Sequence, residues 1–458
     1  MATSVIEPER VTVLADHEPR GDGRYVLYWM QASMRAEHNP ALEYAIQRAN
    51  EHEVPLVVTT TVIANYPDAS ARHFHFMLSG MGQALSAIAR RGATVSVGSP
   101  DDPVDHIRAL AGDAVSIVLD RGYLRHQRNW REQVVDGVGC RVECVEGDVV
   151  VPVDLVSDKQ ETAARTIRPK IERLRDDFIV DLATTSLDHS DAVDVESDID
   201  LSAFDDVGAL LSELGLDDAK GPQPVDWLSA GTSAARARLD DFLDRAAEYD
   251  DDRNLYASSE TSMMSPYLHF GQISPVYIAK ELVERLGPDA DDYLEELVVR
   301  RELAVNYVEH CADYDSWAGL PEWATSSMES HSDDERDHVY TASQLEEGET
   351  HDEVWNTIMH EIRTRGWVHN QLRMYWGKQI LRWTNTPRHA HRTLLDINNR
   401  WFLDGRDPSS YANVGWCFGL HDQGFQERDV IGKVRPFTTA ALKRKDDLDG
   451  WLADSQES

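Results

Sequence analysis

The chain has 458 residues, 41% of them hydrophobic, so it is long enough for two domains and apolar enough to give each a core. Acidic residues outnumber basic ones by 81 to 45, and the net charge of −36 opposes binding to polyanions if it is spread evenly. No single tail carries this charge. We interpret it as adaptation to a salt-rich cytosol, with an acidic partner-binding tail as the alternative.

The sequence contains neither a signal-peptide pattern at its N-terminus nor a run of eighteen apolar residues. We therefore expect a cytoplasmic protein with no membrane partner, and we expect it to be a monomer. Its four cysteines, which form no CxxC pair and no metal-like spacing with histidine, are Cys140, Cys144, Cys311 and Cys417. This spacing predicts reduced structural thiols and no metal site. A disulfide between Cys140 and Cys144 is the alternative.

Residues 1–23 are expected to be a flexible N-terminus, and residues 24–150 alternate strand and helix patterns. Strands are expected at 25–30, 55–63, 93–98, 116–123 and 140–147, and helices at 39–52, 70–92, from Pro103, and at 126–136. This alternation predicts an α/β domain with a Rossmann-like, doubly wound parallel sheet. No GxGxxG follows the first strand, so we expect a ligand at the carboxyl ends of the strands rather than a dinucleotide on that turn.

Residues 151–229 are weakly periodic and rich in Asp, Ser and Gly, which indicates an interdomain linker. After it the 3.6-residue period of a helix recurs without a convincing strand, at 233–249, 274–287, 292–311, 351–383 and 391–403. We therefore expect an all-α domain over residues 230–445, followed by a C-terminal tail at 446–458.

A basic island interrupts the acidic background. From Trp355 to Lys445 there are 15 Lys and Arg against 7 Asp and Glu, a local net charge of +8 that leaves −44 on the other 367 residues. This contrast favours an anionic partner, with internal salt bridges as the alternative. Half of the twelve tryptophans lie in the same region: Trp355, Trp367, Trp376, Trp383, Trp401 and Trp416. Aromatic faces beside cations suit unstacked bases or a flavin ring, although any single tryptophan is more often core.

Six motifs resemble those of class II cyclobutane pyrimidine dimer photolyases, within the photolyase/cryptochrome family, between about residues 24 and 437. They are SDKQETAARTIRPKI (157–171), TSMMSPYLHFGQIS (261–274), LVVRRELAVNYVEH (297–310), HNQLRMYWGKQILRW (369–383), DGRDPSSYANVGW (404–416) and HDQGFQERDVIGKVR (421–435). The resemblance implies an antenna domain at 24–150 and a FAD-binding catalytic domain at 230–445. It also implies repair of pyrimidine dimers in double-stranded DNA, by electron transfer from light-excited reduced FAD to a flipped-out dimer. A cryptochrome-like photoreceptor without repair activity is the alternative, and (6-4) photoproduct repair is disfavoured by the motifs.

The resemblance implies catalytic and cofactor-binding roles for particular residues. Glu296 is expected to hydrogen-bond the dimer, Trp416 to stack on it, and Asn398 to face the redox-active nitrogen of the flavin. The expected FAD contacts are Tyr256, Thr261, Ser262, Ser265, Arg373, Asn398, Asp404, Asp407 and Asp422. Arg373 and Asp422 are expected to pair beside the flavin. Without the resemblance, the Ser/Thr cluster would be interpreted as simple N-capping and Asn398 as a surface residue.

The resemblance also implies an electron path and a DNA interface. Trp376, Trp383 and Trp355 match a tryptophan chain that photoreduces resting flavin, with core packing as the alternative; Trp376 and Trp383 are seven residues apart on one helix, roughly 10 Å along its axis. The expected DNA contacts are Arg300, Trp416, Arg428, Lys433 and Arg435. Arg300 departs from the family pattern, which has a second stacking tryptophan there, and the step from Trp416 to His421 is one residue short. An 8-hydroxydeazaflavin antenna is implied too, but no motif for its pocket is visible.

Overall fold

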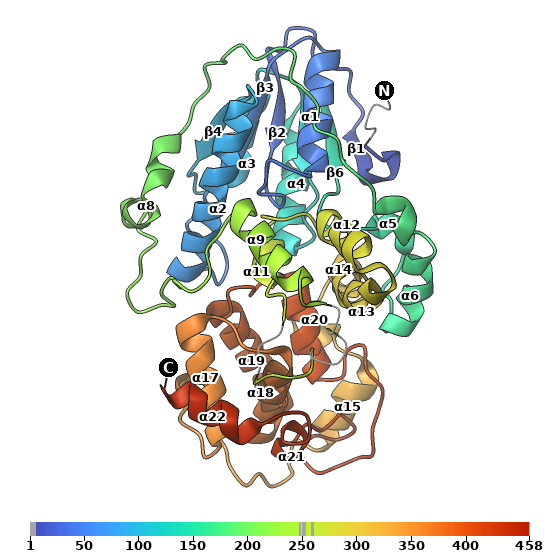
Figure 1. Ribbon diagram of the computed structural model, residues 1–458, viewed down its shortest axis with the longest axis vertical. Coiled ribbons are helices and arrows are strands. Elements are labelled where there is room, and N and C mark those ends of the chain that lie inside the picture. Colours follow the sequence, from blue (N-terminus) through green and yellow to red (C-terminus); the bar gives the residue numbers. More distant parts are fainter. Residues whose placement is uncertain (1–5, 247–248, 250–252, 258–260, 458) are drawn as a thin grey trace.

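The computed structural model describes residues 6–246, 249, 253–257 and 261–457, with a sheet region at one end of its long axis and a helical region at the other (Figure 1). The strands are β1 (Val11–Ala15), β2 (Tyr25–Trp29), β3 (Leu56–Thr61), β4 (Thr94–Gly98), β5 (Ala114–Asp120) and β6 (Arg141–Val145). They form one sheet in the order β1-β6-β5-β2-β3-β4, in which β2 to β6 are parallel. The prediction of an α/β fold with a parallel sheet is confirmed, and the five strands predicted from the sequence lie where they were expected.

The N-terminal segment differs from its prediction. Strand β1 pairs antiparallel with β6 at the edge of the sheet, preceded by the 3-10 helix η1 (Pro8–Arg10). The Arg10 guanidinium is buried and donates to the carbonyls of Val149 (3.1 Å) and Val150 (2.8 Å). The expectation of flexibility over 1–23 is therefore wrong for residues 8–15, because a five-residue edge strand among charged residues has too little periodicity to stand out. Residues 1–5 lie outside the described residues.

Helices cover both faces of the sheet. They are α1 (Pro40–Glu51), α2 (Ala71–Arg90), α3 (Pro103–Ala111) and α4 (Arg125–Gly137). Alternate residues of β2 enter different cores: Val26 and Tyr28 pack with α1 and α2, whereas Leu27 and Trp29 pack with α3 and α4. Because the strands are buried on both faces, their sequences are continuous apolar runs rather than alternating apolar and polar residues. The cysteines at 140 and 144 are free thiols in the second core.

A carboxylate fills the turn after β2. Asp120 Oδ2 accepts the backbone N–H groups of Gln31 (3.0 Å), Ala32 (3.0 Å) and Ser33 (2.9 Å), while Oδ1 accepts the Tyr28 hydroxyl at 2.7 Å. Successive N–H groups of this kind form a concave site that binds anions such as phosphate in other parallel-sheet domains. Here the chain satisfies them with its own side chain.

The segment predicted as a linker is largely structured. It contains α5 (Val153–Val156), α6 (Ala164–Glu172), α7 (Arg175–Phe178), η2 (Leu201–Asp205) and α8 (Val207–Glu213). Helix α6 packs into the helical core, whereas Leu210 and Leu211 of α8 pack back against the sheet region, on the opposite side of the molecule in Figure 1. The segment therefore connects the two regions through packing contacts with both of them.

The helical region contains the helices predicted from the sequence, with differences at 292–311, at 351–383 and in the tail. Its elements are α9 (Thr232–Leu243), α11 (Ser265–His269), α12 (Pro275–Leu286), η4 (Gly287–Ala290), α13 (Asp291–Leu294), η5 (Glu295–Arg300), α14 (Arg301–His310), η6 (Trp317–Gly319), α15 (Glu322–Ser330), α16 (Ala342–Glu347), α17 (Glu353–Arg365), α18 (Asn370–Trp383), α19 (Pro387–Trp401), α20 (Pro408–Cys417), α21 (Thr439–Leu442) and α22 (Leu448–Glu457). The stretch 351–383 is two helices, because Gly366 ends α17 in the left-handed conformation (φ 67°). The predicted tail contains α22. Residues 247 and 248, within the helix expected at 233–249, lie outside the described residues.

One arginine joins the two regions. Arg72, on α2 and 2% exposed, donates to the carbonyls of Ile362 (3.0 Å), Arg363 (2.5 Å), Trp401 (2.7 Å) and Gln223 (2.9 Å). The first three are carbonyls of the C-terminal turns of α17 and α19, where helix carbonyls commonly lack an intrahelical partner; that of Ile362 also accepts the Gly366 N–H at 2.9 Å. A side chain of the sheet region thus caps two helices of the helical region.

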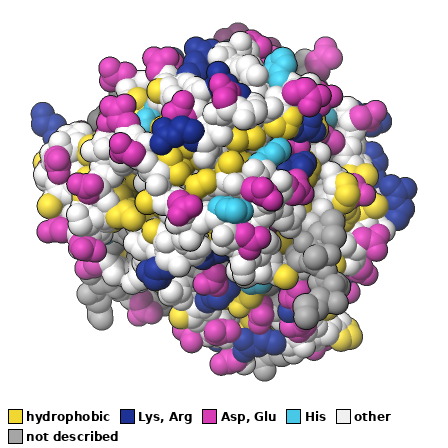
Figure 2. Space-filling view, turned by 90° about the horizontal axis from the view of Figure 1, so that it is seen from above, with side chains coloured by type: hydrophobic (Ala, Val, Ile, Leu, Met, Phe, Trp, Pro, Cys, Tyr) yellow, Lys and Arg dark blue, Asp and Glu magenta, His cyan; other side chains and the backbone are white. Residues whose placement is uncertain are grey.

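Charge is spread over the surface. Acidic side chains are scattered across the sheet end of the molecule in Figure 2 and do not gather into one patch there. Separately, no helix in the described part of the chain is both long and apolar enough to cross a membrane.

Candidate functional site

A cavity of about 360 Å³ lies in the helical region between η5, α14, α18 and α20. Many of the residues predicted for cofactor, dimer or DNA contact line it: Thr261, Ser262, Ser265, Glu296, Arg300, Arg373, Asp404, Asp407 and Trp416. Four further lining residues were not among the site residues predicted from the sequence: Tyr249, Trp367, Asn413 and His421. His421 and Asn413 lie within the recognised motifs, which is the signal that could have identified them. The volume is in the range of small-molecule sites.

A π-helical turn shapes one wall of this cavity. The segment η5 interrupts the predicted helix between α13 and α14, and such turns commonly occur at functional sites. It carries both Glu296 and Arg300 to the cavity. Arg253 donates to Glu296 at 3.2 Å, and desolvation raises the Glu296 pKa above its ordinary value. Arg300 is half-exposed and donates to Glu295 at 2.8 Å, so this guanidinium stands at the rim where a stacking ring was expected.

The ion pair beside the cavity differs from the predicted one. Arg373 on α18 pairs with Asp404 at 3.1 Å and donates to Asn398 Oδ1 at 2.6 Å. Asp422 is held instead by Arg435 through two bonds of 2.8 Å. The predicted Arg373–Asp422 pair is therefore wrong. Asp404 lies in the short connection between α19 and α20, and this connection faces α18. Asp422 lies after the end of α20, where it contacts Arg435 in the irregular segment that follows.

Asn398 and Tyr256, like Asp422, are predicted cofactor contacts that do not line the cavity. Asn398 is 1% exposed, and its amide is engaged by Arg373 and by Asn399 (3.2 Å). Tyr256 donates its hydroxyl to the carbonyls of Leu442 and Asp446, both at 3.1 Å, and so anchors the C-terminal segment. Neither residue is among the described residues that line the cavity. A contact of Tyr256 with the cofactor therefore stays a prediction.

The polar groups of the cavity fit a polar, flat cofactor such as FAD. Thr261 Oγ1 and His421 Nε2 are buried and have no hydrogen-bond partner among the residues that the structure describes, although both residues line the cavity. A buried group left in this state costs about 1–3 kcal/mol unless a ligand satisfies it. Ser262 lies beside them, with its hydroxyl 2.6 Å from that of Tyr293. The nearby Arg373–Asp404 pair supplies a fixed cation for an anionic ring.

Three buried tryptophans lead away from the cavity. Trp355 on α17 lies between Trp376 and Trp383 of α18, with ring centroids 5.5 Å from the first and 5.3 Å from the second. The inner end reaches the cavity wall through Phe402, which is 5.7 Å from Trp376 and 3.8 Å below the Arg373 guanidinium. All three indoles belong to the main helical core, and this packing is compatible with the predicted relay.

The basic island is partly neutralised from within. Ion pairs engage Arg365 with Glu361, Arg373 with Asp404, Arg388 with Glu329, Arg400 with Glu346, and Arg435 with Asp422. Of the predicted DNA contacts, Arg428 and Lys433 are exposed, and no ion pair is found for them within the described residues. Internal salt bridges thus neutralise part of the positive charge of the island. Arg428 and Lys433, which follow the cavity-lining Trp416 in the chain, remain as exposed cations.

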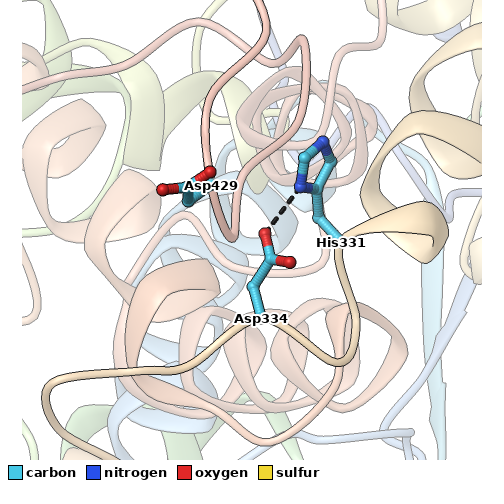
Figure 3. Close-up of side chains that lie close together, drawn as sticks. All are labelled: His331, Asp334 and Asp429. Carbon is cyan, nitrogen blue, oxygen red and sulfur yellow. Dashed lines mark hydrogen bonds and ion pairs between the residues drawn. The ribbon is translucent and has the colours of Figure 1, made fainter.

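His331 and Asp334 form a clamp, by which we mean the set of contacts that holds residues 427–430 against the end of α15. His331 Nδ1 lies 2.6 Å from Asp334, and Nε2 lies 3.3 Å from Glu427. Asp334 also accepts the Val430 N–H at 2.8 Å. Figure 3 shows His331 turned toward Asp334, with Asp429 close by. Because both ring nitrogens face carboxylates, these contacts describe a protonated imidazole bridging α15 to residues 427–430.

The clamp predicts a pH-dependent loosening of residues 427–430. The Asp334 carboxylate raises the pKa of His331 above its ordinary value of 6.5. The clamp is therefore complete below pH of about 6.5 and is lost as pH rises through the higher folded-state pKa. We expect amide exchange of Val430, corrected for its intrinsic rate, to be faster at pH 8.5 than at pH 6. His331→Gln should remove this pH dependence; protection of Val430 that stays constant in the wild type would contradict the clamp.

A second, smaller cavity of about 130 Å³ lies at the carboxyl ends of β2 and β3, where the sequence predicts a ligand crevice. Its walls combine the sheet region with the helical region. Apolar side chains dominate one side, namely Met30, Met34, Tyr66, Phe74, Met77 and Trp130, and His269, Arg406 and Asp407 close the other. Arg406 lies 5.7 Å over the Tyr66 ring. A flat aromatic molecule suits such walls.

Known proteins resemble the chain over its whole length. Residues 26–188 match the family model described as DNA photolyase. The chain is 39% identical to the deoxyribodipyrimidine photo-lyase of Methanothermobacter thermautotrophicus over 98% of both chains. It is 35% identical to that of Arabidopsis thaliana, over 93% of this chain and 88% of the plant protein.

Solved structures share the fold at low sequence identity. A bacterial class III photolyase from Agrobacterium tumefaciens has a TM-score of 0.69 at 18% identity, covering 96% of this chain and 87% of that one. A cryptochrome from Synechocystis sp. PCC6803 has a TM-score of 0.70 at 15% identity, covering 94% and 88%. The fold is therefore that of photolyases and cryptochromes. Given the identity to full-length photo-lyases, the chain belongs to the DNA photolyase family.

Proposed function

We propose that the protein is a light-dependent repair enzyme that splits cyclobutane pyrimidine dimers in DNA, of the class II type, with FAD in the larger cavity. The observation that carries this proposal is the convergence of Glu296, Trp416 and the Arg373–Asp404 pair on one cavity next to a tryptophan chain. When bound there, reduced FAD supplies an electron to the dimer on absorbing light and recovers it once the dimer has split.

The chain's own residues bind and orient the reactants. Thr261 and His421 have unpaired polar atoms for the cofactor, and Arg373 places a fixed positive charge at its side. Trp416 offers a ring face on which a flipped-out base stacks, and Glu296 offers a carboxylate for the base edge.

Double-stranded DNA is the proposed partner. Arg428, Lys433 and Arg435 follow Trp416 in the chain and supply cations for phosphates around the extruded dimer. Arg300 at the rim can stack its planar guanidinium on a base, in place of the second tryptophan of the family. The acidic charge on the rest of the surface confines DNA binding to this face.

The smaller cavity is the proposed site of an 8-hydroxydeazaflavin antenna. Its apolar and aromatic wall and its two arginines, Arg301 and Arg406, suit a flat chromophore with a polar edge. We expect the purified protein, expressed in a host that makes this chromophore, to absorb beyond the flavin bands. Met77→Trp, which fills the apolar wall, should remove this additional absorption and leave the flavin bands; retention of both would place the chromophore elsewhere.

The direct test is illumination of the purified protein with an oligonucleotide that contains one thymine dimer. We expect flavin absorption at about 450 nm, where oxidised flavin absorbs, and loss of the dimer only in light. Bound flavin without dimer loss would favour the photoreceptor alternative. Absence of flavin after reconstitution would contradict both.

Glu296→Gln is expected to separate repair from cofactor binding. The change keeps the shape of the side chain but removes its charge, and a hydrogen bond to a charged group contributes about 1.5–3 kcal/mol. Dimer affinity should therefore fall by about 10- to 100-fold, with flavin content unchanged. The measurement is a titration with dimer-containing and undamaged oligonucleotides. Equal affinity of variant and wild type for the dimer would remove Glu296 from the site.

A further inference from the structure

A buried lysine lies directly behind the proposed stacking ring. Lys378 on α18 is 5% exposed, and its Nζ donates to the carbonyls of Trp416 (3.1 Å) and Cys417 (3.0 Å). These carbonyls end α20, where helix carbonyls lack intrahelical partners and the helix dipole favours a cation. The same Nζ lies 4.3 Å from the centroid of the Trp416 ring, within the range of a cation–π contact.

The approach of the two helices is built into the sequence. Residue 377 is glycine, and a Cβ there would lie 2.5 Å from the Cys417 sulfur. Any larger residue would push α20 away from α18 and withdraw Lys378 from the end of α20. The contact between Lys378 and Trp416 therefore depends on this close approach.

Lys378 has no carboxylate partner. In the described ranges no acidic oxygen lies within ion-pair distance of its Nζ, although a buried ammonium ordinarily requires one. The titratable and charged groups that act on it are Cys417 on α20, and Asp422 and Arg435 on the segment after α20. Asp422 is already paired with Arg435. Burial lowers the pKa of Lys378 to about 8, whereas burial raises that of Cys417 to about 11, so Lys378 loses its proton first.

Trp416 is held between two cations. Arg435 lies 5.8 Å from the centroid of the same ring, and the residue also lines the larger cavity. By contrast, the structure records no cation over the rings of Trp355, Trp376 or Trp383 among the residues it describes. Of these four rings, the cations thus accompany Trp416, which lines the cavity; Trp401, which does not line it, also lies between two guanidiniums, those of Arg72 and Arg363.

We propose that Lys378 is a positioning residue: its ammonium group fixes the Trp416 indole in the cavity wall, and loss of its proton loosens the ring and weakens dimer binding. The inference rests on the proposed stacking role of Trp416. A ring fixed before the dimer arrives loses less conformational entropy on binding. Within the described part of the chain, no other group at the end of α20 both donates to the two carbonyls and lies over the ring.

The ring itself reports the proposed switch in the wild-type protein without DNA. We expect the fluorescence of Trp416, obtained as the difference between wild type and Trp416→Phe, to change between pH 7 and 9 with a midpoint near 8. In Lys378→Met this transition should disappear. In Lys378→Arg, which stays charged over the interval, the signal should remain constant as well and resemble that of the wild type at pH 7. A wild-type difference signal that is flat between pH 7 and 9 would overturn the proposal, even if Lys378→Met does not fold.

Dimer binding supplies the second readout. With holoenzyme, Lys378→Met is expected to bind a dimer-containing oligonucleotide about 2- to 30-fold more weakly than wild type at pH 7, the range that one cation–π contact supports. Wild-type affinity should fall toward the variant's as pH rises to 9. Lys280→Met, on α12 and paired with Glu284 at the surface, is the matched control and should bind as wild type does. Equal affinities of Lys378→Met and Lys280→Met would refute the role of Lys378, whereas a wild type that binds no dimer would refute the proposed function and leave the fluorescence test in force.

Discussion

Replacing Arg72 by methionine is expected to lower the free energy of unfolding by about 3–5 kcal/mol, the cost typical of breaking a buried charged network. Methionine fills a similar volume, so the loss is chiefly that of hydrogen bonds. The carbonyls of Ile362, Arg363 and Trp401 would lose a shared donor inside the protein. Because these groups end α17 and α19, we expect the sheet and helical regions to separate at lower denaturant concentration.

Urea unfolding followed by circular dichroism and by flavin release measures this effect. Arg24→Met is the matched control, because Arg24 forms a half-exposed pair with Asp113 and such pairs contribute only about 0–1 kcal/mol. Flavin release in the Arg72 variant should coincide with or precede unfolding of the sheet region. If the two variants unfold at the same urea concentration, Arg72 is not a link between the regions.

Replacing Trp355 by phenylalanine is expected to abolish photoreduction of bound FAD while sparing repair by enzyme that has been chemically reduced. Trp355 is the middle ring, 5.5 Å from Trp376 and 5.3 Å from Trp383. Without it, the outer two indoles are separated by about two helical turns, roughly 10 Å. Phenylalanine keeps the aromatic packing of the core but is a much poorer electron donor than indole.

The measurement is the rate of flavin bleaching under blue light with an external reductant. Trp401→Phe is the control, because Trp401 belongs to the same core and no ring contact joins it to the three relay tryptophans in the described structure. It should photoreduce at the wild-type rate. Wild-type photoreduction in Trp355→Phe would leave core packing as the role of these rings. Trp376→Phe should match Trp355→Phe.

The sheet could be predicted because its strands are buried on both faces and therefore form uninterrupted apolar runs. Strand β1 could not be predicted, because a five-residue edge strand is too short to show a clear alternation of apolar and polar residues. The break after α17 is indicated in the sequence by Gly366, because glycine is a common C-terminal cap of helices. The helical spacing of apolar residues continues across Gly366, however, and therefore favoured one long helix.

The site was predictable where a short motif carries it and not where distant segments meet. Residues near Thr261 and Trp416 reach the cavity as expected. The partner of Arg373 depends on how the α19–α20 connection turns, and a sequence does not distinguish Asp404 from Asp422 on that ground. Lys378 was missed because nothing in a helical period separates a buried lysine from an exposed one; its burial follows from the glycine beside it and the end of another helix.

The carboxylate of Asp120 also limits what the sheet region can recognise. Cells contain many phosphorylated metabolites, and domains of this topology ordinarily hold them by free N–H groups at the turn that Asp120 occupies. A phosphate arriving there meets a negative charge and no donors. An occupant of the neighbouring crevice would therefore be recognised by its ring system rather than by a phosphate group, and abundant nucleotides would compete poorly for the proposed antenna site.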